Sequence, residues 1–191
     1  MNQLPSLNLS KILRGGGDVS DEGFTSVLEY TEHGASHPLP LVGNAEWRAI
    51  ASHIGDNEYW LAGRIRATLL LECGRCLDPV EHRLEARLET LLHFKPSVKI
   101  PTRSQTQDDE DVVLFGDPSL DLSALFAESL MLEIPNTVRC KSDCRGLCSE
   151  CGTNLNRATA CPSAAPDCPA FGSRTEKREN PFSALKDLFK S

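Results

Sequence analysis

The sequence predicts an α+β protein with an antiparallel β-sheet core, a long hairpin, one or two helices and a C-terminal cysteine-rich segment. Three observations lead to this fold class. Apolar and polar residues alternate along 61–94, apolar residues recur at helical spacing after Asp121, and six of the eight cysteines lie between 140 and 168. With 191 residues, 40% of them hydrophobic, the chain can bury one modest core, so we expect one main domain with appendages.

The first part of the chain gives two expectations. Residues 1–22 contain a run of three glycines and few large apolar side chains, which predicts a flexible N-terminal arm. The core is expected to span residues 23–138. It opens with short apolar stretches at 24–30 and 39–42, separated by glycine and proline, and these predict short strands at the edge of the sheet.

The strongest periodic signal is the alternation along 61–94, whose opposite face carries arginine and glutamate on both halves. Such a pattern indicates two strands with one buried face and cross-strand charge pairs on the other, so we interpret the segment as a long antiparallel hairpin. A helix over 80–94 is the alternative, because Leu84, Leu88 and Leu91 also fit helical spacing.

Shorter sequence patterns predict the elements of the remaining core and of the tail. Residues 101–111 are polar and acidic, which predicts a loop, and 112–116 favour one more strand. Apolar residues at helical spacing between Asp121 and Pro135 predict a helix. In the C-terminal tail, 171–191, a short amphipathic helix is expected over 181–189, where Phe182, Leu185, Leu188 and Phe189 share one face.

The formal net charge of −7 is unevenly distributed. Residues 104–136 carry eight acidic and no basic side chains, whereas 139–191 carry nine basic and six acidic ones. The overall acidity argues against a protein that coats nucleic acid through a broadly basic surface, but the mildly basic tail permits an RNA contact. No window is apolar enough for a membrane span, and the start of the chain lacks a signal-peptide pattern, so we expect a cytoplasmic protein with no membrane partner.

In a reducing compartment, eight cysteines indicate metal ligation or redox chemistry rather than permanent disulfides. Cys73 and Cys76, at the turn of the expected hairpin, and Cys148 and Cys151 each enclose two residues. This spacing lets two sulfurs reach one ion while amides of the turn donate hydrogen bonds to the thiolates. A thioredoxin-type dithiol is disfavoured, because Leu77-Asp78-Pro79 opposes the helix that such a motif needs.

We therefore predict one or two structural Zn²⁺ ions in the cysteine-rich segment 139–170 and the hairpin turn. The candidate ligands are Cys73, Cys76, Cys140, Cys144, Cys148, Cys151, Cys161 and Cys168. Counting does not settle which cysteines share an ion. One partition joins the two pairs of closely spaced cysteines as in a zinc ribbon, and another keeps 140–151 together; we favour the first. Cys161 and Cys168 lie among prolines and are the weaker candidates, and free cysteines are also often simply buried.

Four cations lie beside these cysteines: Arg75, Arg139, Lys141 and Arg145. They are candidates for contacts with RNA phosphates, or they neutralise the formal charge of about −2 on a zinc ion with four thiolates. The five histidines lack ligand spacing, and we find no glycine-rich phosphate loop or catalytic triad. We therefore expect no enzymatic activity and no small-molecule substrate.

The cysteine motifs have further neighbours in a fixed order. Leu71-Glu72-Cys73-Gly74-Arg75-Cys76-Leu77 is followed by Glu133-Ile134-Pro135, Asp143-Cys144-Arg145-Gly146-Leu147-Cys148, Cys151-Gly152 and Asn154-Leu155-Asn156. Over about residues 20 to 190 the chain resembles the YceD family, the large ribosomal RNA subunit accumulation proteins. The family usually has its last two cysteines nearly adjacent, whereas six residues separate Cys161 from Cys168, which weakens a second metal site built on them.

The resemblance implies a factor needed for accumulation of large-subunit ribosomal RNA and for assembly of the 50S ribosomal subunit. We expect a non-enzymatic zinc-binding factor that binds ribosomal RNA or a large-subunit ribosomal protein through the hairpin and the cysteine-rich segment. The alternative is a zinc-ribbon protein–protein adaptor without RNA contact, in which the acidic segment 104–136 recruits a basic partner.

Overall fold

The chain folds into two compact units. A computed structural model describes residues 4–32, 35–105, 109, 111–149 and 151–157. Unit 1 comprises 1–72 and 79–138, and unit 2 comprises 73–78 and 139–191. The described helices and strands all lie in unit 1: β1 Ser6–Asn8, α1 Ser10–Leu13, β2 Val19–Thr25, β3 Glu29–Glu32, β4 Ala35–Pro38, β5 Ala45–Gly55, β6 Glu58–Glu72, β7 Pro79–Phe94, β8 Thr102–Gln105, β9 Asp111–Phe115, β10 Ser119–Asp121 and α2 Ser123–Leu132.

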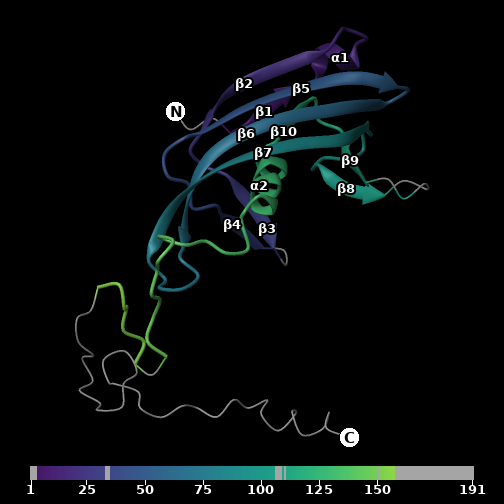
Figure 1. Ribbon diagram of the computed structural model, residues 1–191. Coiled ribbons are helices and arrows are strands. Elements are labelled where there is room, and N and C mark those ends of the chain that lie inside the picture. Colours follow the sequence, from purple (N-terminus) through teal and green to yellow (C-terminus); the bar gives the residue numbers. More distant parts are fainter. Residues whose placement is uncertain (1–3, 33–34, 106–108, 110, 150, 158–191) are drawn as a thin grey trace, which may run out of the picture. The chain divides into compact units, whose positions relative to one another are not determined.

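A six-stranded sheet with the order β2-β5-β6-β7-β9-β8 dominates unit 1 (Figure 1). The predicted hairpin is confirmed, because β6 and β7 pair antiparallel from Glu58 opposite His93 to Glu72 opposite Pro79. The helix considered for 80–94 is therefore wrong. Since side chains alternate along a strand, the apolar residues of both strands point to one face, and most of them are buried.

The sheet is mixed rather than antiparallel throughout, which corrects the expected fold class. β9 runs parallel to β7, with Leu91–Phe94 paired to Val112–Phe115, and β8 lies outside β9 in antiparallel pairing. A parallel pair needs a long connection between its strands. The segment after Phe94 supplies this connection: it passes through β8 at the sheet edge before the chain returns as β9. The region expected as an acidic loop thus contains one strand and the start of another.

The described N-terminal residues, from position 4 onward, form a short strand and a short helix in the segment for which a flexible arm was expected. β1 pairs with β10 through Leu7 opposite Leu120, and the side chains of Leu7, Leu9 and Ile12 are almost fully buried. Because β10 lies far along the chain, no local pattern in the first residues predicts this pairing. The other predicted early strands differ in part: β2 forms one edge of the main sheet, β3 and β4 form a separate two-stranded sheet, and residues 39–42 contribute only an isolated bridge at Leu41.

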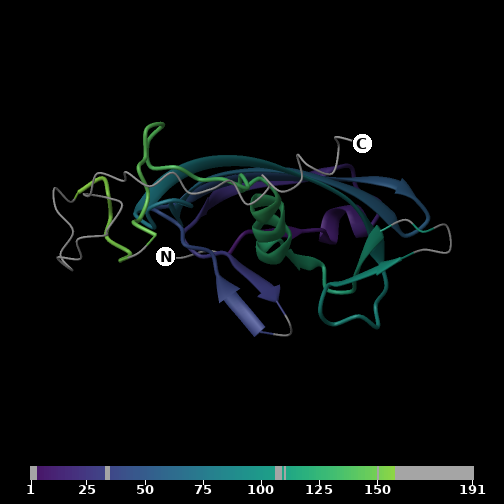
Figure 2. The ribbon, with the colours of Figure 1, turned by 60° about the horizontal axis from the view of Figure 1, so that its bottom comes forward.

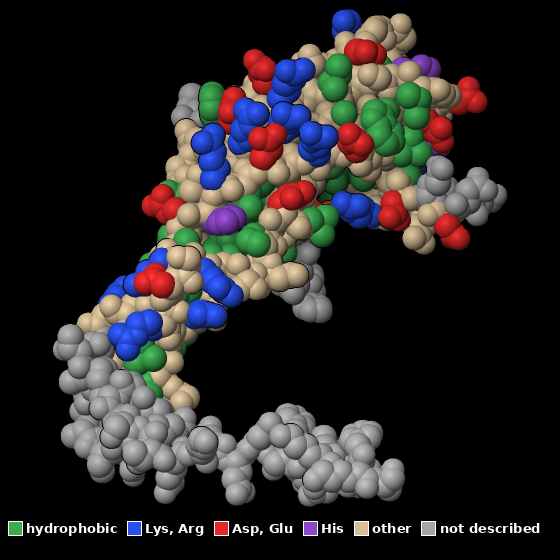
Figure 3. Space-filling model, in the orientation of Figure 1, with side chains coloured by type: hydrophobic (Ala, Val, Ile, Leu, Met, Phe, Trp, Pro, Cys, Tyr) green, Lys and Arg blue, Asp and Glu red, His purple; other side chains and the backbone are tan. Residues whose placement is uncertain are grey.

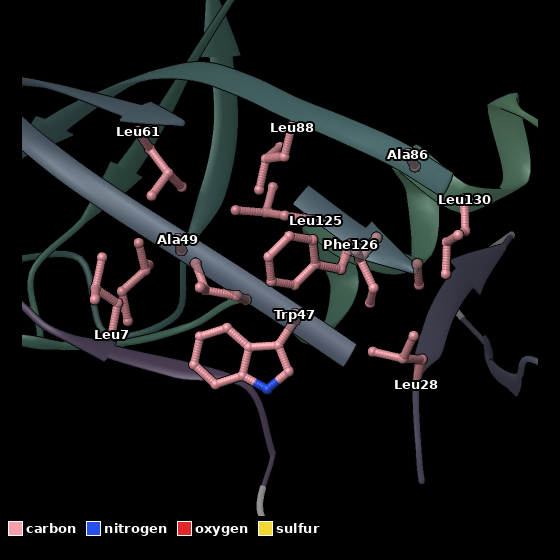
Figure 4. Close-up of a cluster of buried hydrophobic side chains, with 14 of the residues drawn as sticks. Leu7, Leu28, Trp47, Ala49, Leu61, Ala86, Leu88, Leu125, Phe126 and Leu130 are labelled. Atoms are coloured by element: carbon pink, nitrogen blue, oxygen red, sulfur yellow. The ribbon is translucent and has the colours of Figure 1, made fainter. Parts of the chain in front are cut away.

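The core lies between the sheet and helix α2. Figure 2 shows α2 and α1 on the same side of the sheet, and both helices contribute buried residues to one core cluster. Phe126 of α2 is fully buried, and its ring centroid lies 6.1 Å from that of Trp47 on β5 (Figure 4). The Phe126 ring also lies close to Gly63 on β6, where a Cβ would stand 3.1 Å from the ring. The absence of a side chain at Gly63 therefore lets the ring approach the strand. The predicted helix is thus present, two residues after Asp121, whose carboxylate accepts a hydrogen bond from the Ser123 amide.

The opposite face of the sheet is exposed. No described helix or strand covers it, and arginine and glutamate side chains project from β5, β6 and β7. Among the described residues no helix has both the length and the apolar character needed to cross a membrane.

Candidate metal centre

Unit 2 brings four cysteines together from two separate segments. Cys73 and Cys76 belong to the six-residue segment 73–78, and Cys140 and Cys144 belong to the segment that begins at residue 139. Their Sγ atoms all lie within 4.8 Å of one another. The Sγ of Cys73 is 3.8 Å from that of Cys144, and the Sγ of Cys76 is 3.5 Å from that of Cys140. Four cysteines that are far apart in sequence thus form one compact cluster.

The geometry of the cluster fits a tetrahedral metal ion. A Zn–S bond of about 2.3 Å places the sulfurs of a regular tetrahedron about 3.8 Å apart, close to the two observed separations. All four thiols are free of disulfide bonds, and three of them are buried, while Cys140 is exposed. Sulfur ligands in this arrangement are those that zinc prefers in structural sites, so the cluster is compatible with Zn²⁺.

This grouping differs from both partitions considered from the sequence. Cys73 and Cys76 face Cys140 and Cys144 rather than Cys148 and Cys151, and the run 140–151 does not stay together around one centre. The reason lies in the path of the chain between the turns at 73–76 and 148–151, which we call the first and the second knuckle. The amide of Leu147 donates to the carbonyl of Arg75 at 3.0 Å, which brings the residues after Cys144 beside the first knuckle. Sequence spacing contains no information about this hydrogen bond.

Backbone amides of the cluster point at its sulfurs. The amide two residues after the cysteine donates to each of three thiols: Arg75 to Cys73, Asp78 to Cys76 and Gly146 to Cys144. Amides that donate to a thiolate stabilise its negative charge. For Cys73 the amides of Arg75, Cys140 and Cys76 together lower the pKa of the thiol to about 6.

The other three thiols differ in how readily they ionise. At Cys76 the Asp78 amide lowers the pKa, but burial and hydrogen bonds with neighbouring thiols outweigh it and leave the pKa raised. Although the Cys140 residue is exposed, partial desolvation of its thiol raises the pKa of that group. Burial also opposes ionisation of Cys144, yet the Asn156 side chain and the Gly146 amide leave its pKa lowered. Four adjacent thiolates would repel one another, so full ionisation requires a positive ion at the centre.

The two closely spaced cysteine pairs form the same turn. In the first, the Leu77 amide donates to the Cys73 carbonyl at 2.9 Å, and the Cys73 amide donates to the Asp78 carbonyl at 2.9 Å. In the second, the Gly152 amide donates to the Cys148 carbonyl at 2.9 Å, and the Cys148 amide donates to the Thr153 carbonyl at 2.8 Å. The fifth residue has a positive φ in each turn, +59° at Leu77 and +69° at Gly152. The turn at Cys148 thus repeats the backbone of the turn at Cys73.

Polar side chains that had no predicted role in the site hold the two segments of unit 2 together. Asp78 accepts hydrogen bonds from Asn154 at 3.0 Å and from Arg157 at 2.7 Å. Asn156 donates through Nδ2 to the Sγ of Cys144 at 3.4 Å, and its Oδ1 accepts from the Arg145 amide at 2.9 Å. The resemblance included the asparagine pair, but only the structure shows that both side chains serve the cluster.

The four cations predicted near the cysteines all lie in unit 2. Arg75 donates through Nη1 to the Cys144 carbonyl at 3.0 Å, so it stabilises the fold of the unit. Lys141 is 3.9 Å from the carboxylate of Asp143. Arg139 and Arg145 are exposed. Cys161, Cys168 and the amphipathic helix expected over 181–189 lie outside the described residues.

Comparison with known proteins decides the family of the chain. Residues 61–189 match the family described as large ribosomal RNA subunit accumulation protein YceD, and this span includes nearly all of the hairpin, α2 and the four clustered cysteines. The chain belongs to the YceD family. A YceD homologue of Zea mays, described as a chloroplastic large ribosomal RNA subunit accumulation protein, is 29% identical over 124 residues, which cover 53% of this chain and 42% of the relative.

Bacterial relatives of this YceD chain include two uncharacterized mycobacterial proteins. One from Mycobacterium tuberculosis is 32% identical over 95 residues, covering 50% of this chain and 44% of the relative. One from Mycobacterium leprae is 35% identical over 95 residues, covering 50% of this chain and 42% of the relative. The chain thus spans less than half the length of these curated relatives. No solved structure matches it.

Proposed function

We propose that this YceD chain is a non-enzymatic, zinc-binding factor that supports accumulation of large-subunit ribosomal RNA and assembly of the 50S subunit. The observation that carries the proposal is the family match over 61–189, which contains the whole cysteine cluster. The printed description of the maize relative concerns the same process. In this proposal the chain works in the cytoplasm and has no membrane or small-molecule partner.

Zinc would serve the fold of unit 2 rather than chemistry. Cys73, Cys76, Cys140 and Cys144 would hold one ion, and the four thiolates would leave no open position for a substrate. Structural zinc stabilises small folds by about 10–16 kcal/mol, enough to join two segments that are distant in sequence. We assign Cys148 and Cys151, together with Cys161 and Cys168, to a second ion, because the Cys148 turn repeats the hydrogen bonds of the first knuckle.

The partner in this proposal is large-subunit ribosomal RNA or a large-subunit ribosomal protein. The test is ultraviolet crosslinking of the tagged chain in cells, followed by RNA sequencing and by sedimentation of ribosomal particles. We expect enrichment of large-subunit RNA and co-sedimentation with large-subunit precursors. Co-sedimentation without any RNA crosslink would favour the adaptor alternative, and absence of both would contradict the proposed function.

A further inference from the structure

The exposed face of the sheet carries an unusual row of arginines. Arg48 on β5 stands directly opposite Arg64 on β6, and Arg64 stands directly opposite Arg87 on β7. All three side chains are exposed. Like charges in directly opposite positions destabilise a sheet. The row therefore lowers the stability of the sheet, and the packing of the sheet does not explain why three arginines occupy these positions.

Neighbouring carboxylates neutralise only part of this charge. Glu85 is 3.1 Å from Arg64 and 2.9 Å from Arg66, so one carboxylate serves two guanidinium groups. Within the described part of the chain, neither Arg48 nor Arg87 has an ion pair, although Glu22 stands opposite Arg48 in the register. Figure 3 shows the blue side chains of arginine and lysine gathered on this face with fewer red carboxylates among them. The two ends of the row are thus available to an external anion.

A hollow with exposed apolar walls adjoins the row. It has a volume of about 620 Å³, and its lining includes Arg48, Arg64, Phe24, Ile50 and Ala62 together with the carboxylates of Glu22 and Glu46. The Phe24 side chain is 64% exposed and Ile50 is 38% exposed. Nucleic-acid bases stack on exposed aromatic rings and on guanidinium planes, while phosphates pair with the charge of arginine. The hollow and the row together offer both kinds of contact.

We propose that this face, defined by Arg48, Arg64, Arg87, Phe24 and Ile50, binds single-stranded RNA. Phosphates lie along the arginine row, and a base enters the hollow against Phe24. The inference rests on the proposed function and names its partner and its site. A polyanion fits a line of cations better than a protein surface does, because a protein would need several carboxylates at matching intervals. A single strand is required, since only unpaired bases expose a ring for stacking.

The test measures binding of a fluorescein-labelled single-stranded RNA dodecamer of mixed sequence to the purified full chain by anisotropy at several salt concentrations. Arg48→Ala and Arg87→Ala are the informative variants, because neither breaks an ion pair among the described residues. Each should weaken binding and reduce the slope of log K against log salt concentration by about 0.7, the value for one lost phosphate contact on a single strand. Phe24→Ala should weaken binding about 5- to 150-fold without changing that slope.

Arg14→Ala is the matched control, because Arg14 is also exposed but directly follows α1 and belongs to none of the strands that carry the row. Circular dichroism verifies that each variant remains folded. The proposal is overturned if the unaltered chain does not bind the RNA, or if Arg48→Ala and Arg87→Ala bind as tightly as Arg14→Ala.

Sedimentation with large-subunit precursors separates this inference from the proposed function. Row variants that lose association with the particles yet still bind the dodecamer normally would identify a ribosomal protein as the ligand of this face. That result would overturn the RNA inference and leave the proposed function standing. If the unaltered chain binds no particles and crosslinks to no large-subunit RNA, the proposed function itself fails.

Discussion

The Sγ atoms of Cys73 and Cys144 lie 3.8 Å apart although 71 positions separate the two residues in sequence. Cys73 directly follows β6, whereas Cys144 belongs to a segment that comes after all of unit 1 in the sequence. The pair therefore connects the two segments of unit 2. Its geometry supports a metal centre whose ligands come from the first knuckle and from residues 140–144, and it leads directly to a test of the ligand set.

Substitution of single cysteines by serine should show which cysteines bind the same zinc ion. We expect Cys73→Ser and Cys144→Ser each to remove the same zinc ion, because serine does not replace a thiolate ligand. The double variant should lose no more zinc than either single variant. Elemental analysis of the purified proteins measures the zinc per chain.

Cys148→Ser is the control for this assignment. It should leave the ion at Cys73 in place and remove only the second one, so that Cys73→Ser combined with Cys148→Ser loses both. Loss of the same ion from Cys73→Ser and Cys148→Ser would restore the zinc-ribbon partition and contradict the cluster seen in the structure.

Removal of metal should unfold unit 2 while unit 1 keeps its sheet. The hydrophobic core of unit 1 contains none of the clustered cysteines, whereas the described part of unit 2 contains no helix or multi-residue strand to support it. Treatment with a strong chelator should therefore expose residues 139–157 to trypsin while the far-ultraviolet β-sheet signal persists. A cooperative loss of the sheet signal together with the metal would show that the two units depend on each other.

Asn156 should tune metal affinity without acting as a ligand. Its Nδ2 donates to the Cys144 sulfur at 3.4 Å, and partners that orient a metal ligand contribute about 10- to 100-fold to affinity. We expect Asn156→Ala to weaken zinc binding by a factor in this range, measured by competition with a chromophoric chelator. Asn57→Ala, at an exposed turn of unit 1, is the control and should leave affinity unchanged. Equal affinities for both variants would exclude this role.

A methyl group at position 63 should destabilise unit 1. The Cβ of alanine would stand 3.1 Å from the Phe126 ring and 3.2 Å from the Arg48 carbonyl, and both are held firmly in the sheet and core. Overpacking of this kind costs about 1–3 kcal/mol. The midpoint of urea unfolding, followed by tryptophan fluorescence, should therefore fall in Gly63→Ala.

The matched substitution is Gly17→Ala, because an added Cβ at Gly17 meets nothing within 4 Å. It should leave the midpoint unchanged or raise it slightly through a less flexible unfolded chain. If Gly63→Ala is as stable as Gly17→Ala, helix α2 does not pack on β6 as closely as the structure shows.

Sequence patterns predicted the elements whose signal is local and repeated. Alternation along 61–94 gave the hairpin of β6 and β7, because a buried face on a strand imposes a period of two. Helical spacing before Pro135 predicted α2, because a buried face on a helix also imposes a regular spacing on the apolar residues. By contrast, β1 and α1 carry too few residues to show a period, and their partner β10 is remote in sequence.

The sequence by itself determined that the chain has a β-hairpin core, a helix and closely spaced cysteines suited to metal, since spacing and periodicity follow from local geometry. Only the tertiary structure decided which cysteines meet. The hydrogen bond from Leu147 to Arg75 and those from Asn154 and Arg157 to Asp78 bring Cys140 and Cys144 to the first knuckle. Likewise, strand register alone aligned Arg48, Arg64 and Arg87, because pairing between strands is set by contacts that no single segment contains.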